Sequence, residues 1–141
     1  MPFTHDVTVR FKDVDRAGIG YFACVFDWCH FAFEEAIDVA LDGFAGAFGR
    51  DGWMMPLVHA EADFERPFRL GDRLTVRVGV ERIGGRSLTF VFGITTANDP
   101  DTLHATVRHV HAFVDIETME AHPVPQALLD GLVRAGISLP A

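Results

Sequence analysis

The chain has 141 residues, a formal net charge of −8 and an apolar share of 49%. This length and composition fit one globular domain with a substantial core, residues 1–141. The acidic surplus argues against a nucleic-acid partner, because phosphate binding needs a clustered basic face. No apolar run approaches the roughly 18–20 residues that cross a bilayer, and the first residues lack a signal-peptide pattern. We therefore expect a cytoplasmic protein without a membrane partner.

The cysteine content agrees with that compartment. Cys24 and Cys29 are the only cysteines, and on a helix they would lie about 140° apart, where they cannot form a disulfide. We expect both thiols to be free, as in a reducing environment.

The first third of the chain predicts a strand, a loop and a long helix. Residues 7–11 alternate as in a half-buried strand, and residues 13–20 form a turn-like segment with two glycines. Residues 24–42 have helical periodicity. The polar positions of this helix form one stripe: Asp27, His30, Glu34, Glu35, Asp38 and Asp42. Its apolar side, which includes Val39, covers about half the cylinder and needs a curved surface around it.

Strand patterns dominate the rest of the chain. Four extended segments are predicted at residues 55–64, 74–81, 88–94 and 103–116. Turn residues separate them, and a short helix is predicted at 125–135 with a proline at its start.

This order of elements predicts an α+β fold. One strand, a long helix and four strands in an antiparallel meander would give a curved five-stranded sheet wrapped around the helix. Such an arrangement resembles the hotdog fold. The edge strands of this sheet would be exposed in a monomer, so we expect a dimer.

The segment ahead of the long helix has the composition of a hydrolase site. Asp13 and Asp15 lie in a glycine-containing loop that leads into a helix start. A helix N-terminus presents unpaired N–H groups and partial positive charge, which can hold an oxyanion while a carboxylate attacks or activates water. The alternative interpretation is that either aspartate only caps a turn.

The same segment resembles the signature of hotdog thioesterases of the 4-hydroxybenzoyl-CoA thioesterase class. The matching residues are Phe11, Asp13, Asp15, Ala17, Gly18, Tyr21 and Phe22. The resemblance implies that Asp15 is catalytic and that a backbone N–H at or near Phe22 is the oxyanion donor. It also implies that Gly18 and Tyr21 lie beside the substrate.

The resemblance extends along the chain, through Pro67, Gly71 and Asp72 to residues 84–87. It implies that Arg86 and Ser87 contact the phosphates of coenzyme A, although an arginine in a turn is often only solvated. Five further arginines are candidates for the same role: Arg66, Arg69, Arg73, Arg82 and Arg108. Pockets of this family form between protomers of a dimer or a tetramer, so the partner's residues 55–64 are expected to line the acyl site.

Three groups of histidines have two interpretations each. His30 in the polar stripe and His59 in the strand at 55–64 are candidate substrate contacts, or else a partly exposed and a packed residue. His109 and His111 would share a strand face with Asp115, as metal ligands do. The surrounding sequence does not fit a metal-binding β-barrel, so we expect no metal.

The sequence therefore predicts hydrolysis of an acyl-CoA thioester by Asp15, without a cofactor, since coenzyme A is part of the substrate. Many family members have histidine where this chain has Phe22, and Tyr21, Phe22, Phe26 and Trp28 provide flat rings at the helix start. These rings favour an aryl acyl group. The alternatives are a non-catalytic acyl-CoA-binding module and a hotdog dehydratase acting on hydroxyacyl thioesters.

Overall fold

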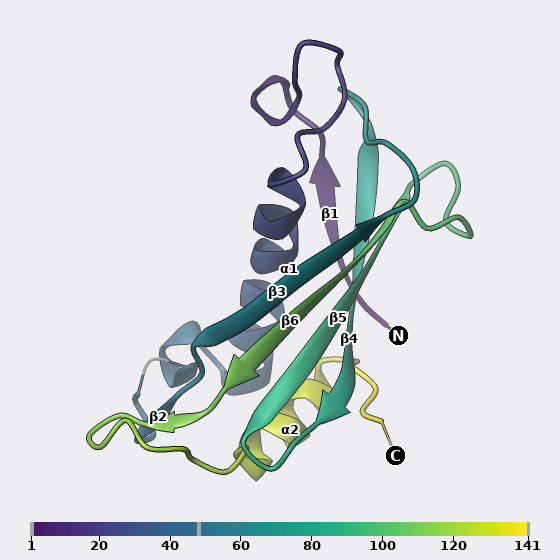
Figure 1. The fold of residues 1–141 in the computed structure, drawn as a ribbon. Helices are drawn as coiled ribbons and strands as arrows, with labels where there is room; N and C mark the ends of the chain where they lie inside the picture. The colour runs from purple at the N-terminus through teal and green to yellow at the C-terminus, as the bar shows by residue number, and fades with distance from the viewer. Residues whose placement is uncertain (1, 48, 141) are drawn as a thin grey trace.

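The computed structural model describes residues 2–47 and 49–140 and has an α+β fold (Figure 1). The main sheet has five strands: β1 (Phe3–Thr8), β3 (Leu57–Phe64), β4 (Arg73–Ile83), β5 (Ser87–Thr96) and β6 (Ala105–Ala112). A small second sheet pairs β2 (Trp53–Met54) with β7 (Val114–Asp115). The helices are α1 (Cys24–Leu41) and α2 (Gln126–Arg134), with 3-10 turns η1 (Phe11–Asp13) and η2 (Phe44–Ala47). The predicted fold class is confirmed.

The strand order is β1-β4-β5-β6-β3, and every neighbouring pair is antiparallel. The predicted four-strand meander is therefore wrong for its first member, because β3 pairs with β6 rather than with β4. The reason is that β1 occupies one edge of β4, from Phe3 opposite Val78 to Thr8 opposite Arg73, and β5 occupies the other. The free edge of β6 remains for β3.

Helix α1 lies on the inner face of this sheet, and its broad apolar side is buried as predicted. The inner residues of β4 and β5 alternate with outward ones and form the core with it: Leu74, Val76, Val78, Val80, Leu88, Phe90, Phe92 and Ile94. Val39 is the exception on the helix, since its side chain is 53% exposed. Neither helix among the described residues is long and apolar enough to span a membrane.

Three strand boundaries differ from the sequence prediction. The first strand covers Phe3–Thr8 instead of residues 7–11, because the chain turns at η1, where the Arg10 N–H donates to the Asp13 carboxylate. The strand predicted at 55–64 is divided at Pro56, which has no N–H to donate. The strand predicted at 103–116 begins at Ala105 and is interrupted at Phe113, after which Val114 and Asp115 pair with β2 instead of β5.

The two ends of α1 have different neighbours. The loop of residues 10–22 precedes its start, whereas α2 and the β4–β5 hairpin lie at the opposite end of the molecule (Figure 1). Strand β3 is an edge strand of the sheet, and seven of its eight residues are exposed. The fold thus leaves one long sheet edge uncovered.

Candidate active site

The loop of residues 10–22 is a narrow hairpin held by backbone hydrogen bonds. The Tyr21 N–H donates to the Asp13 carbonyl at 2.7 Å, and the Asp15 N–H donates to the Ile19 carbonyl at 2.9 Å. The Gly20 N–H donates to the Phe68 carbonyl at 2.6 Å, which ties the hairpin to the segment after β3. The loop is therefore fixed at both its base and its side.

Asp15 lies at the tip of this hairpin with an exposed side chain. Its Oδ1 accepts the Ala17 N–H at 2.9 Å and the Ile19 N–H at 3.4 Å. The turn needs Gly18, whose φ of 75° is in the left-handed region. Within residues 2–47 and 49–140, Oδ2 accepts no hydrogen bond. The backbone thus orients the carboxylate by one oxygen and leaves the other free.

Asp13 has the opposite environment, although it is only two residues away. Its side chain is buried, accepts the Lys12 ammonium at 2.8 Å and accepts the Arg10 N–H at 2.9 Å. Burial alone would raise the pKa of the Asp13 carboxyl, but these hydrogen bonds lower it overall. Asp13 therefore holds the loop as a buried anion. Residue type and spacing alone did not separate these two aspartates, and only the family resemblance singled out Asp15.

The start of α1 offers unpaired backbone donors. The Cys24 and Val25 N–H groups donate to the carbonyls of Tyr21 and Phe22, at 3.0 and 3.3 Å. The N–H groups of Phe22 and Ala23 have no acceptor in the described part of the chain, and no side chain caps the helix. Because a helix N-terminus carries partial positive charge, these two groups suit an oxyanion.

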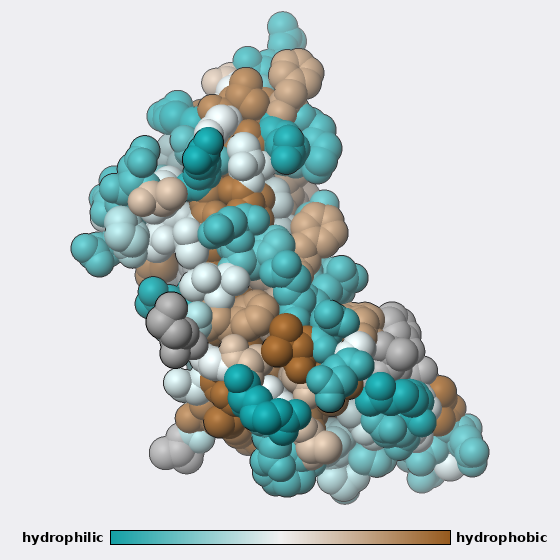
Figure 2. Space-filling view, turned by 180° about the vertical axis from the view of Figure 1, so that it is seen from behind, coloured by the Kyte–Doolittle hydropathy of each residue, from teal (hydrophilic) through white to brown (hydrophobic). Residues whose placement is uncertain are grey.

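Apolar side chains surround this end of the protein. Phe11, Tyr21 and Phe22 are all more than half exposed, and the rings of Tyr21 and Phe22 lie 4.9 Å apart. A hollow of about 360 Å³ lies beside Phe22 and is lined by Ile19, Gly20, Phe22 and residues 64–68. Figure 2, seen from behind, shows hydrophobic side chains at the same end. This surface suits an apolar acyl group.

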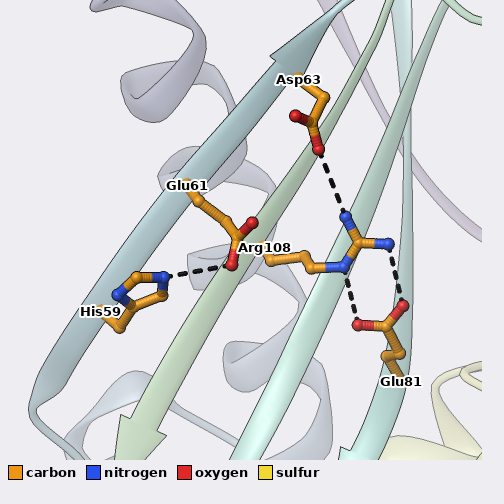
Figure 3. Close-up of polar contacts among 5 residues, drawn as sticks. All are labelled: His59, Glu61, Asp63, Glu81 and Arg108. Carbon is orange, nitrogen blue, oxygen red and sulfur yellow. Dashed lines mark hydrogen bonds and ion pairs between the residues drawn. The ribbon is translucent and has the colours of Figure 1, made fainter.

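The two candidate substrate histidines lie on different sides of the sheet. His30 is partly exposed on α1, with its Nε2 3.6 Å from a carboxylate oxygen of Glu34. His59 lies on the outer face of β3, where its Nε2 is 3.1 Å from Glu61 (Figure 3). Neither histidine forms a hydrogen bond with the Asp15 loop.

Arg86 and Ser87 are not near Asp15 within one protomer. They belong to the β4–β5 hairpin, where the Gly84 N–H donates to the Ser87 carbonyl, and Figure 1 places this hairpin at the other end of the molecule. Arg108 is already engaged on the outer face. It donates to both carboxylate oxygens of Glu81 at 2.8 and 3.0 Å and lies 3.7 Å from Asp63 (Figure 3).

His109 and His111 share the inner face of β6, as predicted from their spacing, and both are buried. Asp115 is elsewhere, with its carboxylate accepting the N–H groups of Glu117 and Thr118. In the part of the chain that the structure describes, no group of three or more His, Cys, Asp or Glu side chains is placed to hold a metal ion. Both cysteines are free, as expected.

The sequence resembles known proteins over most of its length. Residues 9–132 match the family model of the thioesterase-like superfamily. A 1,4-dihydroxy-2-naphthoyl-CoA hydrolase of Nostoc punctiforme is 33% identical over 132 residues, which cover 94% of this chain and 87% of the relative. A hydrolase of the same name from Synechococcus elongatus is 32% identical over 125 residues, which cover 88% and 90%.

Solved structures agree with the sequence comparison. A 1,4-dihydroxy-2-naphthoyl-CoA thioesterase from Synechocystis superposes with a TM-score of 0.82 at 26% identity, covering 94% of this chain and 96% of the other. The dynemicin thioesterase superposes with a TM-score of 0.84 at 25% identity, covering 99% and 100%. These matches confirm the resemblance that the loop of residues 10–22 indicated.

Proposed function

The chain belongs to the thioesterase-like superfamily, and on this premise we propose that it hydrolyses an aryl-CoA thioester to the free acid and coenzyme A. Thioester hydrolysis is the activity of the relatives described above and confirms the class of reaction expected from the sequence. The catalytic role of Asp15, the aryl acyl group and a cytoplasmic location are our proposals. The reaction requires only water and a carboxylate, so the proposal includes no metal or cofactor.

Two observations carry the proposal: the free oxygen of Asp15, in the loop that leads into α1, and the unpaired N–H groups at the start of that helix. Oδ2 would attack the thioester carbonyl, or it would take a proton from the attacking water. In either route the carbonyl oxygen gains negative charge, which the N–H groups of Phe22 and Ala23 stabilise. The C–S bond then breaks, coenzyme A leaves as the thiol, and water supplies the oxygen of the new acid.

The alternatives fit this site less well. A binding module has no need for a carboxylate whose one oxygen is oriented and whose other oxygen is free. A dehydratase of hydroxyacyl thioesters needs a histidine with the acid, and no histidine among the described residues forms a hydrogen bond with residues 10–22.

The test replaces Asp15 by asparagine, which keeps an acceptor oxygen for the Ala17 N–H. Turnover of benzoyl-CoA in a free-thiol assay should fall at least about 100-fold, because the nucleophile or base is lost. The matched control is D6N, at an exposed aspartate of β1. If D15N retains near-normal turnover, Asp15 is not the catalytic carboxylate. Benzoyl-CoA should exceed butyryl-CoA in kcat/KM by at least about tenfold, which needs roughly 1.4 kcal/mol.

We also propose that the active unit is a dimer, or a dimer of dimers, joined along β3. This strand exposes its backbone edge together with Leu57, Val58 and Phe64. Two copies paired antiparallel along β3 would bring the β4–β5 hairpin of each to the Asp15 end of the other. Arg86 and Ser87 could then reach the coenzyme A phosphates of the neighbouring site, which one protomer alone does not allow.

The variant V58K tests this assembly, because a lysine on an exposed strand edge opposes edge pairing. Light scattering should show a dimer or tetramer for the unmodified protein and a monomer for V58K, with activity lost. The control is V39K, at the exposed valine of α1. A monomer with full activity would rule out a shared site.

A further inference from the structure

The interface between α1 and β6 contains polar atoms that nothing in the described structure satisfies. His109 and His111 are only 1% and 2% exposed. Both ring nitrogens of His109 and the Nε2 of His111 have no hydrogen-bond partner among the described residues. Buried polar groups are almost always paired, so three unpaired nitrogens in one place need an explanation.

The bonding state of these rings follows from their contacts. The Nδ1 of His111 lies 2.8 Å from the Met55 carbonyl, which can only accept, so Nδ1 carries the proton and Nε2 is a bare acceptor. Burial lowers the pKa of both rings, that of His109 to about 4, so both are neutral at pH 7. Neutral His109 has one N–H donor and one acceptor. The site therefore offers one donor and two acceptors, without net charge.

Aromatic rings surround these nitrogens. Phe92 meets His109 edge-on at 4.9 Å, and Phe33 stacks on His111 at 4.4 Å. Phe26 lies nearly parallel to His109, at a centroid distance of 6.3 Å. Phe26 follows Phe22 by one helical turn, which is about 5–6 Å along the axis. An aryl group whose carbonyl is held at Phe22 would extend along α1 to the depth of His109.

The inner face of β3, next to His109, is exposed at Ala60. Ala60 of β3 pairs with His109, so its side chain points to the same inner face, yet it is exposed. His30 of α1 is partly exposed, and its charge adds to the burial that lowers the pKa of both rings. The nitrogens themselves are buried, and the nearest strand to them, β3, is exposed at Ala60 and has no neighbour on its other side.

We propose that His109 and His111 recognise a ring hydroxyl of the acyl group, at a position remote from the thioester. A phenolic hydroxyl is one donor and one acceptor, so it can donate to Nε2 of His111 and accept the N–H of His109. A carboxylate or an ammonium fits poorly, because both rings are neutral and their surroundings are apolar. This inference rests on the proposed function and specifies its substrate as a hydroxyaryl-CoA ester.

The test compares two esters that differ only in the remote hydroxyl, 1,4-dihydroxy-2-naphthoyl-CoA and 1-hydroxy-2-naphthoyl-CoA. The unmodified protein should favour the dihydroxy ester in kcat/KM by at least about tenfold, because an ester without the remote hydroxyl leaves the histidine nitrogens unpaired. H109F should remove this preference, whereas H109Q, which keeps a donor and an acceptor, should retain part of it. H122F, the same substitution at a partly exposed histidine outside the α1–β6 interface, should keep the full preference.

Equal kcat/KM for the two esters, or an unchanged preference in H109F, would overturn the inference and assign the nitrogens to buried water. Hydrolysis of benzoyl-CoA in the same assay tests the proposed function separately. If no aryl ester is hydrolysed, calorimetric binding of the two naphthoyl esters to the D15N protein decides the inference. Equal affinities would then overturn it, and tighter binding of the dihydroxy ester that H109F abolishes would support it.

Discussion

The two flanks of α1 differ in how they are closed. Near its C-terminal end, Gly131 of α2 packs so closely that a Cβ there would lie 2.0 Å from the Ala40 carbonyl oxygen. Arg134 donates to the same carbonyl at 3.3 Å, and Leu128 and Leu132 are fully buried. On the other flank, toward β3, the strand is exposed and His109 and His111 have unpaired nitrogens.

This difference shows which flank of α1 is fully packed by residues of the same chain and which is not. Among the described residues, the α2 flank has no buried side-chain polar atom without a partner, so its packing contributes to stability. The β3 flank leaves both apolar surface and polar atoms without partners, which costs stability in the isolated protomer. Our proposals assign partners to that flank: a second copy along β3 and an acyl group beside His109.

The largest effect should follow from breaking the closed flank. In G131A, the new methyl group would collide with the backbone of Ala40 rather than with a movable side chain. We expect a loss of about 3 kcal/mol in the free energy of unfolding, at the upper end of overpacking costs. Urea denaturation followed by circular dichroism measures it. G85A is the control, because a Cβ at Gly85 meets nothing within 4 Å. A loss in G131A no greater than in G85A would show that α2 moves freely on α1.

The open flank should be sensitive to acid. The pKa of His109 falls from an ordinary 6.5 to about 4 on folding, because burial and the neighbouring His111 and His30 disfavour its charged form. When the pH is lowered, His109 of the unfolded chain is therefore protonated at a higher pH than His109 of the folded protein. Above pH 6.5 this histidine does not reduce the free energy of unfolding. As the pH falls from 6.5 to about 4, the free energy of unfolding decreases by about 3 kcal/mol in total.

This acid effect can be assigned by substitution. In H109F the decrease in unfolding free energy between pH 6.5 and 4 should be about 3 kcal/mol smaller than in the unmodified protein. The Asp13 carboxyl has a lowered pKa and titrates only below its ordinary 3.8, so its contribution is lost at lower pH. Identical pH profiles for the two proteins would contradict the assignment.

Most of the fold could be predicted from the sequence, because burial imposes a period on each element. The alternation in β4 and β5 and the wide apolar side of α1 gave the layers correctly. The position of β3 could not be predicted, since it depends on β1 taking the edge of β4. Pairing between distant strands leaves no local pattern.

The site was predictable where a local motif defines it. The Asp15 loop and the helix start were placed from residues 11–22 alone. The different environments of Asp13 and Asp15 could not be predicted, because these two carboxylates, only two residues apart, differ through the hydrogen bonds of the folded loop. The alternation placed His109 and His111 on one face, but their lack of partners depends on the apolar side chains packed around them. The roles of Arg86 and His59 depend on a second copy and stay predictions.

The smallest effect is expected on the outer face of the sheet, where polar groups are paired but exposed to water. Arg108 makes a bidentate contact with Glu81, which lowers the pKa of that carboxyl, yet both side chains are at least 30% exposed. Water screens such pairs and already solvates the separate charges, so the ion pair should contribute at most about 1 kcal/mol. A double-mutant cycle of E81Q and R108Q, measured by urea denaturation, isolates this coupling from other effects of each substitution. The coupling should shrink further in 1 M NaCl, where charges more than about 3 Å apart are screened. A coupling above about 2 kcal/mol that survives high salt would mean that the outer face is not freely hydrated in solution, and that another surface covers Arg108 there.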